Sequence, residues 1–125
     1  MINDFNVMKS VIVYQFLIAK AAGFPALPQK VVENCDTKLK QMTEKLNERL
    51  AGRKTLGETF TLADIVLCET IINGPMLSGA DWGEKFPNIK AYYDACCETL
   101  PHIKENENFA MEVAKGLKAK AEAAA

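Results

Sequence analysis

Apolar side chains recur at steps of three and four residues through most of this sequence, and the alternation typical of β-strands is nearly absent. The clearest example lies between residues 29 and 51, where an apolar stripe is backed by lysine- and glutamate-rich positions. The stripe consists of Val32, Cys35, Leu39, Met42 and Leu46. A coiled-coil seam would look similar, but the stripe is short for one, so the core of a helical bundle is favoured. The sequence therefore predicts an all-α fold, a bundle of about five to six helices.

Glycine and proline separate the helical segments. "GFPALP" is predicted to end the first helix, with Gly23 as its C-terminal cap, and Gly52 follows the second helix in the same way. The predicted helices span residues 4–22, 29–51, 61–72, 87–99 and 102 to about 120. We assign residues 1–109 to one helical domain. We interpret 110–125, which is rich in alanine and lysine and has little to bury, as a terminal helix or tail.

The octapeptide "FTLADIVL", residues 60–67, places a threonine and an aspartate in an otherwise apolar run. Thr61 at the N-cap and Asp64 three residues later form a capping box, in which each side chain accepts from the other residue's backbone N–H. Phe60 and Ile65 then stand at the positions of a hydrophobic staple. The pattern indicates a helix start, and a catalytic Asp64 is the alternative.

Composition excludes several classes of protein. The chain has 125 residues, which is enough for one domain. Its 15 basic and 16 acidic side chains give a net charge of −1, and this balance does not indicate nucleic-acid binding. The longest apolar stretch is interrupted by Gln15 and Lys20, so no membrane span is predicted. No secretion signal is evident, and we expect a cytoplasmic protein.

The sequence offers no catalytic or metal-binding motif. The cysteines, none of them in a C-x-x-C pair, are Cys35, Cys68, Cys96 and Cys97. With His102 as the single histidine, a zinc site is not predicted. We expect the cysteines to be reduced, with a redox role for the vicinal pair Cys96–Cys97 as the alternative. His102 is expected to be a surface or capping residue rather than a catalytic base.

Two segments resemble a known family. "LNERLAGRKTLGETFTLADI" is similar to the region around the capping box in the C-terminal, all-helical domain of the glutathione transferase superfamily. "FPNIKAYYDACCETLPHIKE" resembles a later helix of the same domain, with Tyr92 or Tyr93 where many members carry Trp-Tyr. The two matches lie within residues 45–106, about half the chain, and both motifs are structural.

The resemblance implies two functions. In the superfamily, glutathione and the activating residue belong mostly to a thioredoxin-like N-terminal domain, for which this sequence shows no βαβ pattern. The chain alone is therefore expected to bind no cofactor and to catalyse no conjugation. Similar domains in elongation factor 1 subunits and in aminoacyl-tRNA synthetase complexes assemble proteins, which implies a non-catalytic interaction module in translation. The alternative is the helical half of a glutathione S-transferase, which would contribute part of an electrophile pocket and dimer contacts; the early Met is compatible with such a truncation.

Candidate interaction residues follow from these two functions. Binding to a protein partner or to a second copy is expected through the first two helices and the loop around Asp81 and Trp82. An exposed Trp82 would be an anchor, whereas a buried one would only cover the core. Tyr14 could line a hydrophobic pocket completed by a partner domain, or be a buried aromatic. The tail lysines, Lys115, Lys118 and Lys120, alternate with acids and give only weak support for tRNA binding.

The capping box generates the first prediction. Replacing Thr61 and Asp64 together by alanine should lower the free energy of unfolding by about 1–3 kcal/mol, because the first turn of the helix loses its cap. Urea unfolding of both proteins measures the difference. An unchanged urea midpoint would rule out the capping box.

Overall fold

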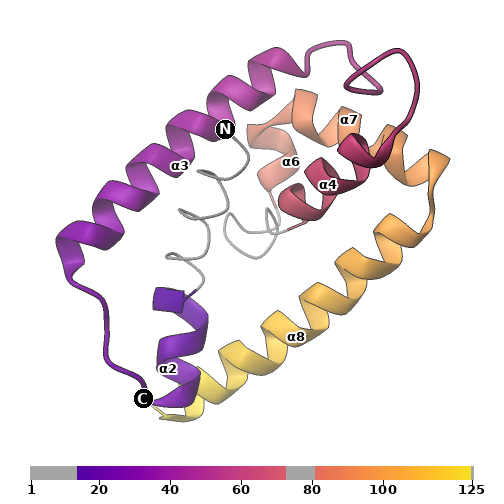
Figure 1. Ribbon diagram of the computed structural model, residues 1–125. Coiled ribbons are helices and arrows are strands. Elements are labelled where there is room, and N and C mark those ends of the chain that lie inside the picture. Colours follow the sequence, from indigo (N-terminus) through magenta and orange to yellow (C-terminus); the bar gives the residue numbers. More distant parts are fainter. Residues whose placement is uncertain (1–13, 73–80, 125) are drawn as a thin grey trace. The chain divides into compact units, whose positions relative to one another are not determined.

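The computed structural model describes residues 14–72 and 81–124, and within these ranges it is all-helical, with no strand. The all-α fold class is therefore confirmed. Figure 1 shows the elements in chain order. They are η1 (Tyr14–Ile18), α2 (Ala19–Ala22), α3 (Gln29–Arg49), α4 (Leu62–Ile71), α6 (Trp82–Lys85), α7 (Pro87–Thr99) and α8 (His102–Ala124).

The helix bounds agree closely with those predicted. Helix α7 spans the predicted residues, and α3 and α4 each end within two residues of the prediction. The final helix, predicted to end at about residue 120, is a single helix that reaches Ala124. It crosses the boundary predicted between residues 109 and 110 without a break. The division into a domain of residues 1–109 and a terminal helix or tail of residues 110–125 stays a prediction. The predicted start of the first helix, residues 4–13, lies outside the described residues.

The chain divides into two compact units, which we describe separately: Met1–Met42 with Met111–Ala125, and Thr43–Ala110. In the first unit, the described part of the first helix begins as a π-helix, η1, and continues as α2. Gly23 ends α2 with a φ of 70°, in the left-handed region where glycine is favoured, as expected of a C-terminal cap. Phe24 then donates its N–H to the carbonyl of Ala19 at 2.9 Å.

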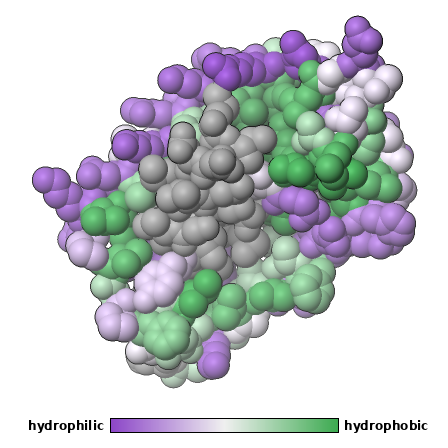
Figure 2. Space-filling view, in the orientation of Figure 1, coloured by the Kyte–Doolittle hydropathy of each residue, from purple (hydrophilic) through white to green (hydrophobic). Residues whose placement is uncertain are grey.

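Helix α3 has the predicted division into two sides. Leu39 is buried, and the other positions of the apolar stripe are half-buried. The opposite positions are all exposed, and Figure 2 shows the corresponding hydrophilic surface along this helix at the upper left. They are Lys38, Lys40, Glu44, Lys45, Glu48 and Arg49.

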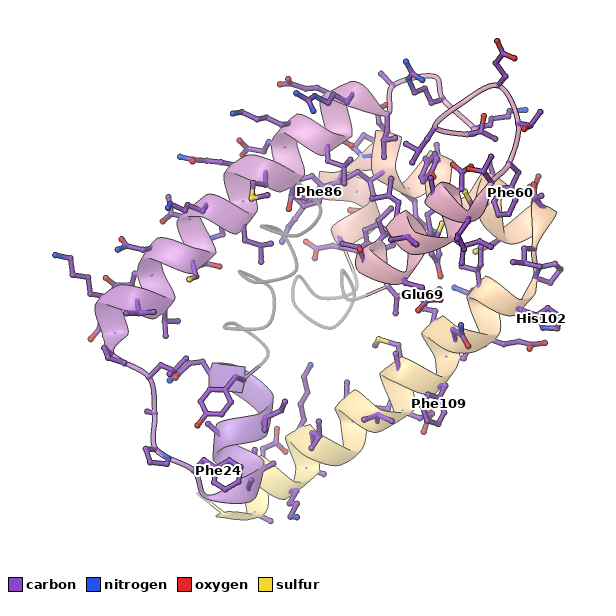
Figure 3. All side chains as sticks on the ribbon, viewed as in Figure 1. Phe24, Phe60, Glu69, Phe86, His102 and Phe109 are labelled. Atoms are coloured by element: carbon purple, nitrogen blue, oxygen red, sulfur yellow. The ribbon has the colours of Figure 1, made fainter. Side chains whose placement is uncertain are left out.

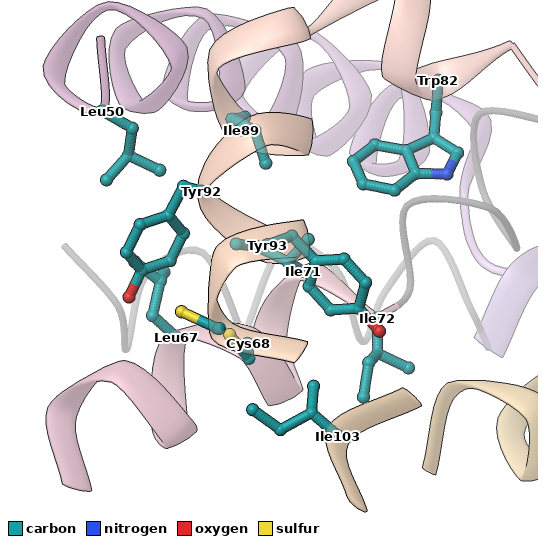
Figure 4. Close-up of a cluster of buried hydrophobic side chains, with 11 residues drawn as sticks. Leu50, Leu67, Cys68, Ile71, Ile72, Trp82, Ile89, Tyr92, Tyr93 and Ile103 are labelled. Carbon is teal, nitrogen blue, oxygen red and sulfur yellow. The ribbon is translucent and has the colours of Figure 1, made fainter. Parts of the chain in front are cut away.

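The core of the second unit lies between α4, α6, α7 and the start of α8 (Figure 4). Its buried members are Leu50, Leu67, Cys68, Ile71, Ile72, Trp82, Ile89, Tyr92, Tyr93, Cys96 and Ile103. Trp82 and Tyr93 meet edge to face, with ring centroids 6.2 Å apart and planes inclined by 77°. This arrangement is one that aromatic pairs prefer, and it holds the short helix α6 against α7.

A side chain of α3 sets the start of α7. Asn47 Oδ1 accepts hydrogen bonds from the backbone N–H groups of Asn88, at 3.0 Å, and of Ile89, at 3.1 Å. These groups lie in the first turn of α7, where no intrahelical acceptor is available. Pro87 occupies the preceding position, where a missing N–H costs nothing. Helix α7 is thereby fixed to the end of α3 within this unit.

Helix α8 offers a direct test of the core. Ile103 is 2% exposed in the core, whereas Phe109, on the same helix, is 72% exposed. Ile103→Ala should lower the free energy of unfolding by about 2–5 kcal/mol, because it leaves a cavity. Phe109→Ala, which removes more side-chain atoms, should change it by about 0.5 kcal/mol or less. Urea unfolding compares the two, and equal effects would contradict this core.

Candidate functional site

The carboxylate of Asp64 accepts several hydrogen bonds in the second unit. It is fully buried at the start of α4. Oδ1 accepts from the hydroxyl of Tyr92, at 2.6 Å, and from the backbone N–H of Leu56, at 2.8 Å. Oδ2 accepts from the backbone N–H of Thr61, at 2.9 Å. One side chain therefore joins α4, α7 and the loop between α3 and α4.

The hydrogen bonds decide the ionisation of this group. Burial by itself raises the pKa of a carboxyl, because it disfavours the charged form. At Asp64 the bonds from Tyr92, Thr61 and Leu56 outweigh burial and leave the pKa below its ordinary value. Burial, followed by the bond to Asp64, raises the pKa of the Tyr92 phenol, which keeps its proton as a donor. The pair is thus a carboxylate and a neutral phenol at neutral pH.

The residues of the predicted capping box lie together. Thr61 is at the N-cap of α4 in an extended conformation, and both halves of the box are present. Phe60 is half-buried and packs against the core, and Ile65 is half-buried in the first turns of α4. Sequence reasoning found these residues but missed Leu56 and Tyr92, whose bonds to Asp64 are not local. The geometry leaves Asp64 little freedom to act as a base, because its oxygens are already engaged.

A second buried acid accepts from the neighbouring tyrosine of α7. Glu107 on α8 is buried, and its Oε2 accepts from the Tyr93 hydroxyl at 2.8 Å and from Lys104 Nζ at 2.6 Å. Burial, followed by the bond to Glu107, raises the pKa of Tyr93. Sequence analysis did not identify Glu107. The adjacent tyrosines on α7 were the available signal, because a buried hydroxyl needs a partner.

The cysteines are free thiols, and those of the second unit are poor nucleophiles. Burial raises the pKa of Cys68, of Cys96 and of Cys97, which disfavours the reactive thiolate. These shifts weigh against a redox role for the vicinal pair. Within residues 14–72 and 81–124, no group of histidine, cysteine and acidic side chains is arranged to hold a metal ion.

Asp81 and Trp82 occupy different environments. Asp81 precedes α6 and forms an exposed ion pair with Lys85 at 3.3 Å. Trp82 is 7% exposed and belongs to the core, with Lys90 Nζ 5.7 Å from its ring centroid. The geometry therefore favours the interpretation in which Trp82 covers the core over the one in which it is an exposed anchor for a partner. An interface at Asp81 remains a prediction.

Tyr14, the predicted pocket residue, lies in η1 of the first unit. It is half-buried, and its hydroxyl donates to the carbonyl of Pro25 at 3.1 Å. The bond ties η1 to the segment that follows α2. Its role in a pocket completed by a partner domain remains a prediction.

Apolar side chains are also exposed on the second unit. On α4, Leu62 is 73% exposed and Val66, one turn later, is also exposed. Glu69 continues the same side of the helix and accepts from Asn106 Nδ2 of α8 at 3.0 Å. Figure 3 labels Glu69 on α4 and Phe109 on α8. Because the core excludes Leu62 and Val66, these side chains are available to a partner.

Acid titration should reveal the Asp64 carboxylate. Its lowered pKa in the folded state means that it adds stability above the ordinary carboxyl pKa, and that this contribution is lost as the pH falls through the folded-state pKa. Asp64→Asn should lower the free energy of unfolding by about 1.5–3 kcal/mol at pH 7. Below about pH 4 the difference between the two proteins should shrink.

Urea unfolding at several pH values measures this difference. The control is Asp81→Asn, since Asp81 forms only a solvent-screened pair and its replacement should have little effect at any pH. A difference at Asp64→Asn that does not change with pH would contradict the assignment.

Comparison with known families identifies the domain. The family model described as "Glutathione S-transferase, C-terminal domain" matches residues 7–99, about three-quarters of the chain. No curated protein and no solved structure matches the chain significantly. The all-helical fold and the capping box at Thr61 agree with this match. The chain therefore belongs to the glutathione S-transferase C-terminal domain family.

Proposed function

We propose that this chain is a non-catalytic protein-interaction module that assembles a cytoplasmic translation complex, of the elongation factor 1 or aminoacyl-tRNA synthetase type. The observation that carries the proposal is the exposed apolar side of α4, with Leu62 and Val66 one turn apart. Neither residue is needed to complete the core. Large contiguous apolar patches mark interaction sites, and we infer that Leu62 and Val66 are part of such a patch.

The buried polar groups support the same function. Asp64 and Glu107 are both occupied by hydrogen bonds from tyrosines, and the buried thiols Cys68 and Cys96 have raised pKa values. These side chains stabilise the helices rather than offer a base or a nucleophile. An enzymatic function is thus less well supported than a binding function.

In the described residues, no helix is both long and apolar enough to cross a membrane.

Direct binding of nucleic acid is not part of the proposal. Among the tail lysines, Lys115 pairs with Glu112 at 3.2 Å, and both side chains are exposed. Mixed charges of this kind are typical of a solvated helix rather than of a phosphate-binding surface. We expect tRNA to be reached, if at all, through the partner protein.

The second candidate is the helical half of a glutathione S-transferase, with which the family match is equally compatible. In that case a thioredoxin-like domain would bind glutathione, and the helical domain would supply part of the electrophile pocket and dimer contacts. The parent gene discriminates the two. A thioredoxin-like domain upstream supports the transferase, whereas a synthetase or other translation domain downstream supports the assembly module.

The surface of α4 can be tested by charge. Leu62→Glu combined with Val66→Glu should abolish association with the partner, because it places two charges against an apolar surface, and should leave the urea midpoint nearly unchanged. Size-exclusion chromatography with light scattering, on the chain alone and mixed with cytosolic extract, followed by identification of what co-elutes, measures the association.

Val113→Glu is the matched control, since Val113 is 45% exposed and Val66 is 43% exposed. It should leave the association intact. Co-elution of elongation-factor or synthetase subunits that survives the α4 double variant would place the contact elsewhere. A chain that recovers no such subunit would favour the transferase half.

A further inference from the structure

The segment between α2 and α3 has the sequence Phe-Pro-Ala-Leu-Pro-Gln-Lys, residues 24–30. Residues 24–28 adopt no regular secondary structure. Phe24 is 57% exposed, and Figure 3 shows it at the end of α2. Pro25, Ala26 and Pro28 are also exposed, and Leu27 is half-buried.

This sequence favours the polyproline II conformation. Pro25 and Pro28 have φ fixed near −65°, as that helix requires. Phe24 and Leu27 each precede a proline, which disfavours the α region and favours β or polyproline II. Four of five consecutive residues are therefore biased in the same direction. Binding such a segment costs little conformational entropy.

The spacing arranges the side chains in two ridges. Polyproline II has three residues per turn, so residues i and i+3 lie on one side. Phe24 and Leu27 form one ridge, Pro25 and Pro28 form the other, and Ala26 lies on the third side. An apolar–proline pair thus occurs twice in succession. Lys30, an exposed cation, follows the second pair after one residue.

We propose that Phe24–Lys30 is a docking segment for a partner domain of the SH3 type. Such a domain binds PxxP segments in a groove lined by aromatic side chains. The two apolar–proline pairs fill two adjacent pockets of the groove, and Lys30 meets an acidic side chain beside them. The segment lies in the first unit, so this proposal is independent of the α4 surface of the second unit.

Two side chains of η1 form hydrogen bonds with the segment in the free protein. Gln15 Oε1 accepts from the N–H of Leu27 at 2.9 Å, and the Tyr14 hydroxyl donates to the carbonyl of Pro25 at 3.1 Å. Leu27 must turn outward to lie on the same side as Phe24. This movement breaks at least the bond from the Leu27 N–H to Gln15. Lys30 lies in the first turn of α3, where the carbonyl of Pro28 accepts from the N–H groups of Val31, at 3.0 Å, and of Val32, at 3.3 Å. Binding must therefore also open this turn.

The full chain can be titrated into a ¹⁵N-labelled SH3 domain that selects apolar-Pro-x-apolar-Pro-x-cation ligands. We expect shifts at the aromatic groove of that domain. Pro25→Ala combined with Pro28→Ala should weaken binding at least tenfold, and so should Lys30→Glu. Pro101→Ala, at an exposed proline outside the segment, should have no effect.

Tyr14→Phe gives a test with the opposite sign. It removes one of the two side-chain hydrogen bonds from η1 to the segment, so it should strengthen binding by about two- to tenfold. Circular dichroism should show the same helix content in every variant. The proposal is overturned by shifts outside the aromatic groove, by no shifts at all, or by equal binding of the native chain and the double proline variant.

Discussion

Unit Thr43–Ala110 depends on one buried carboxylate. A charge removed from water is costly unless its hydrogen-bonding capacity is used, and breaking such an arrangement leaves groups without partners. Asp64 meets this condition with donors from three places in the chain: Thr61 beside it, Leu56 in the preceding loop and Tyr92 on α7. Its local role is to begin α4. Its wider role is to fix the loop and α7 against that start.

Helix α7 carries the directional contacts of this unit. Successive residues on a helix point about 100° apart, so the neighbouring tyrosines reach different elements. Tyr92 reaches Asp64 of α4, and Tyr93 reaches Glu107 of α8. These two bonds are directional, so they add a geometric requirement to the apolar packing of α7. The aromatic pair, which in the sequence only marked the family resemblance, therefore determines how α4 and α8 are held against α7.

The sequence predicted what local chemistry determines. The bounds of α7, the N-cap at Thr61, the glycine that ends α2 and the two sides of α3 each follow from a few neighbouring residues. The distant partners, Tyr92 for Asp64 and Tyr93 for Glu107, could not be predicted in this way. Tyr92 is 28 residues from Asp64, and no periodicity connects them. Trp82 was open to two interpretations, because the burial of a residue outside the long helices depends on what its segment packs against.

Buried polar side chains and exposed apolar side chains give different information about function. A buried side chain whose hydrogen bonds serve the fold, such as Asp64 or Glu107, cannot be changed without loss of stability, and it carries no information about a partner. Exposed apolar residues differ from these, because polar residues at the same positions would leave the fold equally stable. Leu62 on α4 and Phe24 after α2 are therefore better guides to binding than any buried polar group. They belong to different units of the chain, so variants at one surface leave the residues of the other unchanged.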